Sequence, residues 1–423
     1  AIGAYSLQAN TTAHKNTASG YGALFTNTTG ACNTASGWKA LYLNTTGTYN
    51  TASGSQSLYG NTTGANNTAT GTQSLLSNTT GGHNSAFGMW ALYSNTTGTR
   101  NTASGSCALY TNTAGNDITA TGYKALAVST GSQNTASGSY AMYANTTGTY
   151  NTAMGVTALG ANTTGSSNTA SGRYALRNNT TGCFNVAHGF QSLLSNTTAS
   201  YNTAVGACTL FANTTGACNT GVGFQALKSN TCAHRNTALG YQAAKSTTSG
   251  YDNTIMGHRA YEVNTTGAHS VAIGSYSGYK NTTGCRNISI GSFSLYKPTT
   301  AHYNIAIGVC AQCALNTTSG NIAIGFSALR HQTGGGSNTA VGHTAMQYNT
   351  TGSGHTALGY EALLANTTSH SNTAVGHQSL LSNTTGNNNT AIGKRSMRTN
   401  TTGCLNTASG MYALKSNTTA NSN

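Results

Sequence analysis

The sequence predicts an all-β protein, a parallel β-solenoid of about 25 coils with 17 residues in each coil. Three observations lead to this fold class. The motif NTAxGxxALxxNTTGxx returns every 17 residues, glycine stands at its fifth place in every copy, and charged residues make up only 5% of the chain. A fixed period of this size is typical of stacked structural units, each of which packs on the next.

The repeat runs from one end of the sequence to the other. Coils begin at residues 16, 33, 50 and so on in steps of 17 up to residue 406, with one 16-residue coil at 118–133. Positions one to seventeen of a coil are counted from the Asn that opens NTAxG. We therefore expect residues 1–423 to form a single continuous array, cut within a coil at both ends.

Seventeen residues are too few for two helices and a turn, and Thr, Asn and Gly disfavour even one helix. We expect a first strand at NTAxG, a second strand around xxALx, and a turn at NTTGxx, because Asn and Gly mark turns. Pro298 replaces the turn Asn in one coil, which fits this assignment because proline has no N–H for a strand ladder.

The glycine at position five indicates a backbone requirement. Either its φ angle is positive or a neighbouring chain segment passes too close for a Cβ atom, and both conditions call for glycine. Six of these structural turn glycines are Gly20, Gly37, Gly54, Gly274, Gly308 and Gly325.

The core is predicted from side chains that change together. Where position four becomes Ile, position two becomes Val or Ile, as in the pairs Val271/Ile273 and Ile305/Ile307. Residues two apart in a strand share a face, so we expect positions two and four to point into the core. Leu at position nine adds the large apolar group, as at Leu24, Leu41 and Leu58, and Asn at positions one and twelve is expected to form amide ladders along the axis.

Such a core contains little apolar volume per coil, so association with sister chains would stabilise it. We expect a homotrimer, with a self-assembled filament as the alternative partner arrangement. The net charge of +14 favours weak binding to anionic glycans such as surface polysaccharides. A nucleic-acid-binding protein would show a dense basic patch, and membrane insertion would need about 18 consecutive apolar residues, so neither is expected.

No enzyme activity and no cofactor are predicted. Only four acidic residues are present and they stand in isolated, variable positions, whereas acid-base catalysis needs paired or oriented groups. The 12 histidines are scattered over different coil positions, which favours surface decoration over a metal site.

The ten cysteines leave two alternatives open. Cys310 and Cys313 form a CxxC without a second pair at zinc-site spacing. Five others fall at position sixteen or seventeen, at the coil edge, where disulfides between coils or chains and free thiols are both compatible with the sequence. These are Cys32, Cys183, Cys218, Cys285 and Cys404.

The tripeptide NTT occurs 19 times, and each copy is formally an N-glycosylation sequon. An Asn ladder at the turn needs no sugar, and we favour that interpretation. The candidate glycosylation sites are Asn27, Asn44, Asn61, Asn78, Asn145, Asn162, Asn264 and Asn383.

The stretch GAHSVAIGSYSGYKNTTGCRNISIGSFSL, followed by NIAIG at 304 and 321, resembles the head repeats of YadA-like trimeric autotransporter adhesins. The form NTAxGxxALxxNTTG is similar to repeats of phage and bacterial tail-fibre-type proteins. The resemblance implies a left-handed parallel β-roll that assembles as a trimer. It implies no ligand site, because no residue here matches a defined one, and the adhesin repeat is shorter than 17 residues.

These observations favour a non-enzymatic structural fibre or adhesin shaft, extracellular and located at a cell or virion surface, that presents Tyr, Trp38, Trp90 and basic side chains to a host or surface glycan. One alternative is a self-assembled extracellular filament with N-linked sugars at the NTT turns. A minor alternative is an ice-binding solenoid, because flat Thr columns order water. Val and Ile replace Thr at position two on the expected core face, so this Thr column is expected to be buried.

Overall fold

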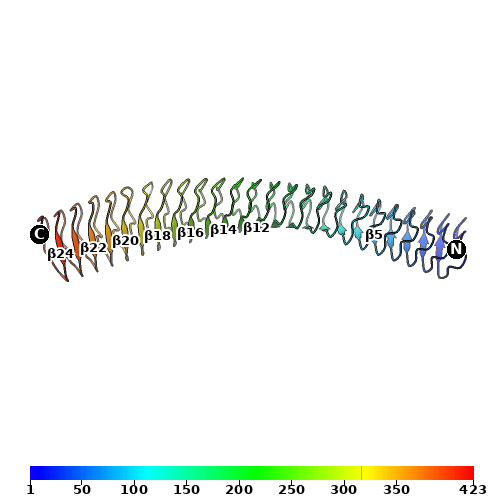
Figure 1. The fold of residues 1–423 in the computed structure, drawn as a ribbon, viewed down its shortest axis with the longest axis horizontal. Coiled ribbons are helices and arrows are strands. Elements are labelled where there is room, and N and C mark those ends of the chain that lie inside the picture. The colour runs from blue at the N-terminus through cyan, green and yellow to red at the C-terminus, as the bar shows by residue number, and fades with distance from the viewer. Residues whose placement is uncertain (316) are drawn as a thin grey trace. The chain divides into compact units, whose positions relative to one another are not determined.

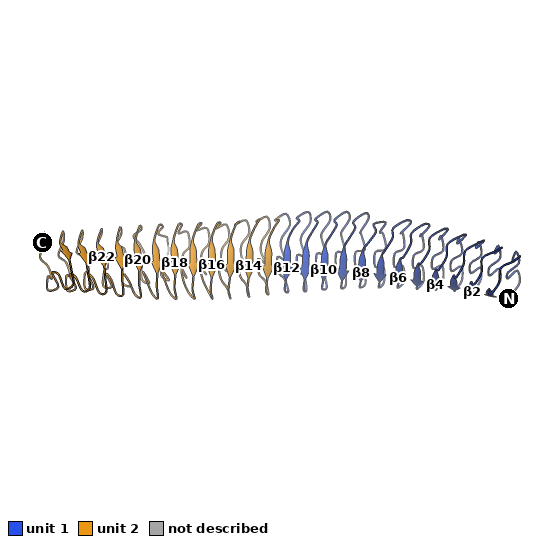
Figure 2. Ribbon diagram, turned by 60° about the horizontal axis from the view of Figure 1, so that its bottom comes forward, with its two compact units in different colours: residues 1–215 blue, residues 216–423 orange. Residues whose placement is uncertain are grey.

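The structure is a computed structural model that describes residues 1–315 and 317–423. Within these ranges it contains parallel strands and turns and no helix, which confirms the predicted all-β solenoid with a repeat of about 17 residues. The chain divides into two compact units, residues 1–215 and residues 216–423 (Figure 2). Both units are built from the same coil.

Each described strand has three residues and covers positions two to four of its coil. Unit 1 contains β1 (Thr17–Ser19), β2 (Thr34–Ser36), β3 (Thr51–Ser53), β4 (Thr68–Thr70), β5 (Ser85–Phe87), β6 (Thr102–Ser104), β7 (Thr119–Thr121), β8 (Thr135–Ser137), β9 (Thr152–Met154), β10 (Thr169–Ser171), β11 (Val186–His188) and β12 (Thr203–Val205). Unit 2 contains β13 (Thr220–Val222), β14 (Thr237–Leu239), β15 (Thr254–Met256), β16 (Val271–Ile273), β17 (Ile288–Ile290), β18 (Ile305–Ile307), β19 (Ile322–Ile324), β20 (Thr339–Val341), β21 (Thr356–Leu358), β22 (Thr373–Val375), β23 (Thr390–Ile392) and β24 (Thr407–Ser409).

Within each unit, every strand pairs in parallel with the strand of the next coil, and Figure 1 shows the arrows following one another in chain order. The register joins equivalent positions, for example Thr34 with Thr51, and it holds at the short coil, where Thr119 pairs with Thr135. Residues at one coil position therefore form a column along the unit, and neighbours within a column come from successive coils.

The strand is turned the opposite way from the prediction. Its middle residue, alanine in most coils, points inward and is buried, while positions two and four face outward. Val271 and Ile273 are half-buried on either side of the buried Ala272, and Ile305 and Ile307 stand in the same relation to their own middle alanine. The prediction that positions two and four point into the core is therefore wrong, and position three, which is small in most coils, points inward instead. The larger side chains pack along their columns on the outside.

The predicted leucine core is confirmed, since Leu24, Leu41 and Leu58 are each 0% exposed. The segment around them is a turn rather than the predicted second strand. In the coil at 33–49, Lys39 and Leu41 have φ angles of +54° and +49°, a left-handed conformation that favours glycine. The Lys39 N–H donates to the Tyr21 carbonyl of the preceding coil at 2.8 Å, and the Leu41 N–H donates to the Ser57 carbonyl of the following coil at 3.0 Å. Hydrogen bonds to both neighbouring coils hold this costly backbone shape.

Glycine is required at position five for both of the predicted reasons. The φ angles of the six predicted turn glycines lie between +126° and +136°. A Cβ atom added to Gly20 would also lie 2.5 Å from the carbonyl oxygen of Gly37 in the next coil. Neighbouring coils touch backbone to backbone here, which leaves no room for a side chain.

The predicted asparagine ladders are present. At position twelve, the Nδ2 atom of Asn44 donates to Oδ1 of Asn27 at 2.7 Å, and Asn61 donates to Asn44 in the same way. At position one, Asn33 Nδ2 donates to the Gly47 carbonyl at 2.8 Å, while its Oδ1 accepts the backbone N–H of Asn50 at 2.9 Å. These side chains are buried, so their hydrogen bonds replace those that water would make.

Unit 2 shows how a large side chain enters this narrow interior. Tyr261 takes the place of leucine at position nine and is 1% exposed. The same position is Gly278 in the following coil, where an added Cβ would collide with the Tyr261 ring, and Ala244 in the preceding coil. The two small residues make the space that the ring fills, and burial raises the pKa of Tyr261 to about 12.

Candidate binding surfaces

Two outward surfaces follow from the columns. We call the side chains at positions two and four the strand face, because they project from the strands. We call the outward side chains at positions six, seven, ten and eleven the turn face. Ring contacts between Tyr276 at position seven and Tyr279 and Tyr296 at position ten show that these columns share one surface.

The strand face carries no lysine, arginine, aspartate or glutamate in any coil. In unit 1 it presents mainly Thr and Ser, as in β2, whose Thr34 and Ser36 are exposed. In unit 2 it presents aliphatic columns, including Ile288, Ile305 and Ile322 at position two. A surface without charge over so many coils is unusual for a protein exposed to water on all sides.

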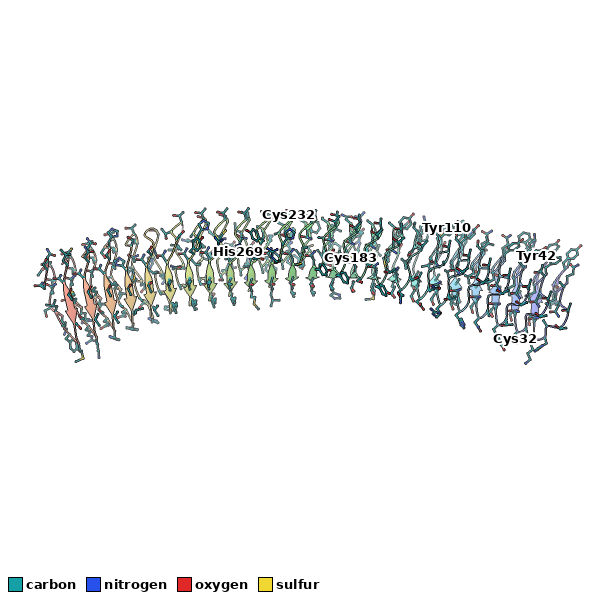
Figure 3. The ribbon with its side chains drawn as sticks, in the orientation of Figure 1. Cys32, Tyr42, Tyr110, Cys183, Cys232 and His269 are labelled. Atoms are coloured by element: carbon teal, nitrogen blue, oxygen red, sulfur yellow. The ribbon has the colours of Figure 1, made fainter. Side chains whose placement is uncertain are left out.

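The turn face of unit 1 carries aromatic ladders. Phe25 and Tyr42 stack with ring centroids 4.9 Å apart and planes 2° from parallel, and Tyr59 continues the ladder at 5.3 Å. A second ladder joins Tyr93 and Tyr110 at 4.9 Å. Figure 3 shows Tyr42 and Tyr110 above the strand arrows of this unit. The coil spacing of about 4.8 Å places the rings at stacking distance.

The turn face is also basic. All but four of the 18 lysines and arginines stand at positions six, seven, ten and eleven, and the exceptions are at position seventeen. Several lie over aromatic rings: Lys39 Nζ is 4.7 Å from the Trp38 ring centroid and 5.3 Å from that of Tyr42. A surface of aromatic rings and cations suits flat or ring-shaped anionic ligands.

Three of the four carboxylates are paired with arginine from the same or a neighbouring coil. Asp117 and Asp252 each accept a bidentate pair of hydrogen bonds, from Arg100 and from Arg235, and these arginines hold the pKa of both carboxyls below their usual range. Glu262 lies 2.6 Å from Arg259 Nε. These carboxylates therefore act as structural ion-pair partners.

The candidate glycosylation sites lie inside the coil. All eight predicted Asn residues are at most 1% exposed. Asn78 is representative, because its Nδ2 donates to Asn61 Oδ1 at 2.8 Å and to the Gly81 carbonyl at 2.9 Å. Both amide hydrogens are used, so the folded coil does not offer this nitrogen to a sugar, and the ladder interpretation of NTT is the one the geometry supports.

The cysteines at position sixteen have a role that the sequence did not reveal. Cys183 Sγ accepts the backbone N–H of Ser166, at position sixteen of the preceding coil, at 3.3 Å, and donates to the Thr181 carbonyl at 3.4 Å. Cys285 and Cys404 make the same pair of contacts. Ser, His and Asn at position sixteen accept the same backbone N–H in other coils. The recurrence of hydrogen-bond acceptors at position sixteen is the sequence pattern that indicates this role.

All ten cysteines are free thiols in the structure. Cys313 of the CxxC segment is half-buried, and burial raises the pKa of its thiol, which lowers its reactivity. Across the described residues, no three His, Cys, Asp or Glu side chains come together as a metal site.

His355 replaces the position-one asparagine in one coil of unit 2 and is 1% exposed. Its Nδ1 accepts the backbone N–H of Asn372 at 3.1 Å, so Nε2 carries the proton and contacts the Ser369 carbonyl at 2.8 Å. This arrangement stabilises the neutral form of the imidazole, because one ring nitrogen accepts a hydrogen bond and the other donates one. Burial lowers the pKa of His355 to about 4.

We expect the coil at 355–371 to lose stability in acid. The unfolded imidazole titrates near 6.5 and the folded one near 4, so the stabilisation is complete above pH 6.5 and falls as the pH drops towards 4. The full loss is about 3 kcal/mol. Amide hydrogen exchange in this coil, measured between pH 7 and 4 and corrected for intrinsic rates, reports it. His355→Asn, which restores the residue of the regular coil, should remove this pH dependence; if it does not, His355 is not its source.

No protein-family model matches the chain, and no curated protein matches it either. In the ranges that the structure describes, no helix is long and apolar enough to cross a membrane.

Proposed function

We propose that this chain is a non-enzymatic, extracellular structural fibre segment that associates with its own copies through the strand face and contacts anionic surface glycans through the turn face. The observation that carries the proposal is the outward orientation of positions two and four. Side chains that looked like a core from the sequence form an exposed, uncharged surface in a single chain.

The aliphatic part of the strand face supports self-association most directly. Columns of Val and Ile run through β16 to β19, and Val271, Ile273, Ile305 and Ile307 are each only half-buried by their own chain. Burying this surface against sister chains removes apolar area from water at no cost in charge desolvation. Three copies around a common axis would cover it, so the homotrimer, and the left-handed winding implied by the adhesin resemblance, are part of the proposal.

The expected result is a trimer of about three times 42.9 kDa in mass photometry of the purified chain. Ile307→Lys places a charge on the strand face and should shift the protein to monomers while the coil stays folded, because Ile307 projects outward. Val309→Lys is the matched control, since Val309 is 44% exposed at position six of the turn face, and it should leave the trimer intact. A monomeric unmodified protein, or an equal effect of both substitutions, would contradict self-association through this face.

A second function, ice binding, is favoured by one specific observation. The Thr column at position two was expected to be buried, and the structure places it outside: Thr17, Thr34 and Thr51 are exposed, each beside Ser at position four. In unit 1 this makes a double column of hydroxyls spaced about 4.8 Å along the unit and about 6.6 Å across it. Thermal hysteresis in the unmodified protein would support this function, and its absence would remove it.

The glycan-coated filament is less well supported, since NTT asparagines such as Asn44 and Asn78 donate both amide hydrogens inside the folded coil. The fibre proposal needs no covalent sugar. Its attachment chemistry lies in the rings and cations of the turn face.

A further inference from the structure

The short coil at 118–133 differs from the regular repeat at several interior and surface positions together. Ile118 replaces the Asn of position one, and Ser129 replaces the Asn of position twelve. The hydroxyl of Ser129 accepts the Asn145 side chain at 3.0 Å and donates to the Gly131 carbonyl of its own coil at 3.4 Å, so it joins the ladder on the C-terminal side. The coil's strand β7 still pairs in register with β6 and β8, and a further substitution, at position ten, changes the surface.

At position ten this coil has Ala127, where neighbouring coils have tyrosine. The ladder of Tyr93 and Tyr110 stops at Ala127, and Tyr143 follows in the next coil. Two coil steps separate Tyr110 from Tyr143, about 9.6 Å, so the missing side chain leaves a slot between two rings. A cavity of about 390 Å³ lies at this place, with both tyrosines and Ala127 in its lining.

The slot has a fixed floor and a charged rim. Ala127 is 6% exposed and forms the floor, whereas Val128 and Tyr143 are 38% and 37% exposed at the opening. Lys124, in the same coil as Ala127, also lines the cavity. Trp90 closes another side, and its indole N–H donates to Gln73 Oε1 at 2.7 Å, which holds the ring in place.

We propose that this slot binds one acidic pyranose unit of a polysaccharide, with the sugar ring in place of the missing aromatic side chain. The C–H groups on the two faces of a pyranose pack against aromatic rings. A flat ring held by contacts of 3.5–4.0 Å on each side requires its two neighbours to be only about 7–8 Å apart. A pyranose chair is thicker than a flat ring and therefore suits the wider separation of Tyr110 and Tyr143. The carboxylate of the sugar pairs with the Lys124 ammonium, and the hydroxyls remain at the open rim. The Lys124 ammonium lies 5.4 and 5.9 Å from the ring centroids of Tyr123 and Tyr140, and an acidic sugar would give it a partner of opposite charge as well.

This inference rests on the proposed glycan contact and assigns it to named residues. The test is calorimetric titration of the full chain with a trimer of galacturonic acid, and with a trimer of galactose as the neutral probe. We expect the acidic probe to bind and the neutral probe to bind at least several-fold more weakly. Ala127→Tyr, which completes the ladder and fills the slot, should weaken binding of the acidic probe about tenfold or more, the usual worth of one stacking contact. Lys124→Gln should remove the preference for the acidic probe.

Leu76→Tyr is the matched control, because Leu76 stands at position ten between Tyr59 and Tyr93, outside the cavity, and this variant should bind as the unmodified chain does. Unchanged binding in Ala127→Tyr, equal losses in Leu76→Tyr, or no binding by the unmodified chain would each overturn the slot. If the acidic probe binds and Ala127→Tyr binds equally well, glycan contact stands and only this site is wrong. The oligomeric state tests the fibre independently of all these results.

Discussion

Gly155→Ala is expected to open the stack of unit 1 at its coil. Gly155 has a φ of +129°, and an added Cβ would lie 2.7 Å from the carbonyl carbon and oxygen of Gly172. Backbone cannot rotate away as a side chain can, so the coils must separate. The hydrogen bond from the Gly172 N–H to the Met154 carbonyl, at 2.8 Å between these two coils, would then lengthen. We expect a local loss of more than about 3 kcal/mol, from strain and broken hydrogen bonds together.

Hydrogen exchange across residues 134–184 measures this loss coil by coil, which suits a repeat protein whose unfolding is not two-state. Gly410→Ala is the control, since Gly410 has a similar φ of +120° but nothing within 4 Å of the added Cβ. It should cost only the backbone strain, about 1–3 kcal/mol. Equal effects of the two substitutions would show that contact between coils does not explain the glycine column.

Asn78→Asp is expected to be nearly as damaging. The aspartate has lost the two N–H donors that bind Asn61 and the Gly81 carbonyl, and it would face these two acceptor oxygens with a buried negative charge. Only the bond from Asn95 Nδ2 to this side chain remains satisfied. Breaking a buried polar network in this way costs about 3–5 kcal/mol.

Acid should partly rescue Asn78→Asp, because a protonated carboxyl is neutral and regains one donor. The measurement is the difference in hydrogen exchange between this variant and the unmodified chain at pH 7 and at pH 4. Asn417→Asp is the matched control: Asn417 is the last rung of its ladder and is only partly buried, with longer bonds of 3.2 and 3.3 Å to Asn400 and Ala420. If both substitutions cost the same, the ladder does not contribute through burial.

Much of the coil could be predicted because its interior requires particular residues. The period, the glycine at position five, the buried leucine at position nine and the asparagine ladders each leave a column of one residue type in the sequence. Both candidate reasons for glycine proved to hold at Gly20, where a positive φ and a close backbone contact coincide. Where a coil position accepts only one residue type, the special property of that residue type indicates the structural requirement at the position.

The direction of the strand could not be predicted from the same pattern. The paired changes at Val271 and Ile273 show only that positions two and four share a face. Side chains that pack against each other on an outer face change together just as core side chains do. The decisive signal was the alanine between them, Ala272, whose small size fits a narrow interior. The left-handed backbone at Lys39 and Leu41 was also missed, because neither residue type favours it and the hydrogen bonds that impose it come from other coils.

The surfaces were predicted least well, since variable positions carry little pattern. The sequence predicts that aromatic and basic side chains lie on the surface. It does not predict the ring ladders, because these depend on the spacing between coils. The gap at Ala127 is visible only once Tyr110 and Tyr143 are known to flank it. The same holds for Cys183, whose role as a hydrogen-bond acceptor follows from the backbone N–H of the coil before it.

The most direct test of this account is a crystal structure of the purified chain, because every inference depends on stacked coils with alanine inside and positions two and four outside. The account predicts one 17-residue coil for each step of about 4.8 Å, Asn78 buried in its ladder, and Ile305 and Ile307 on the outer surface or in contact with a sister chain. Helices, the lack of a regular axial step, or Ile305 and Ile307 enclosed by their own coil would contradict it.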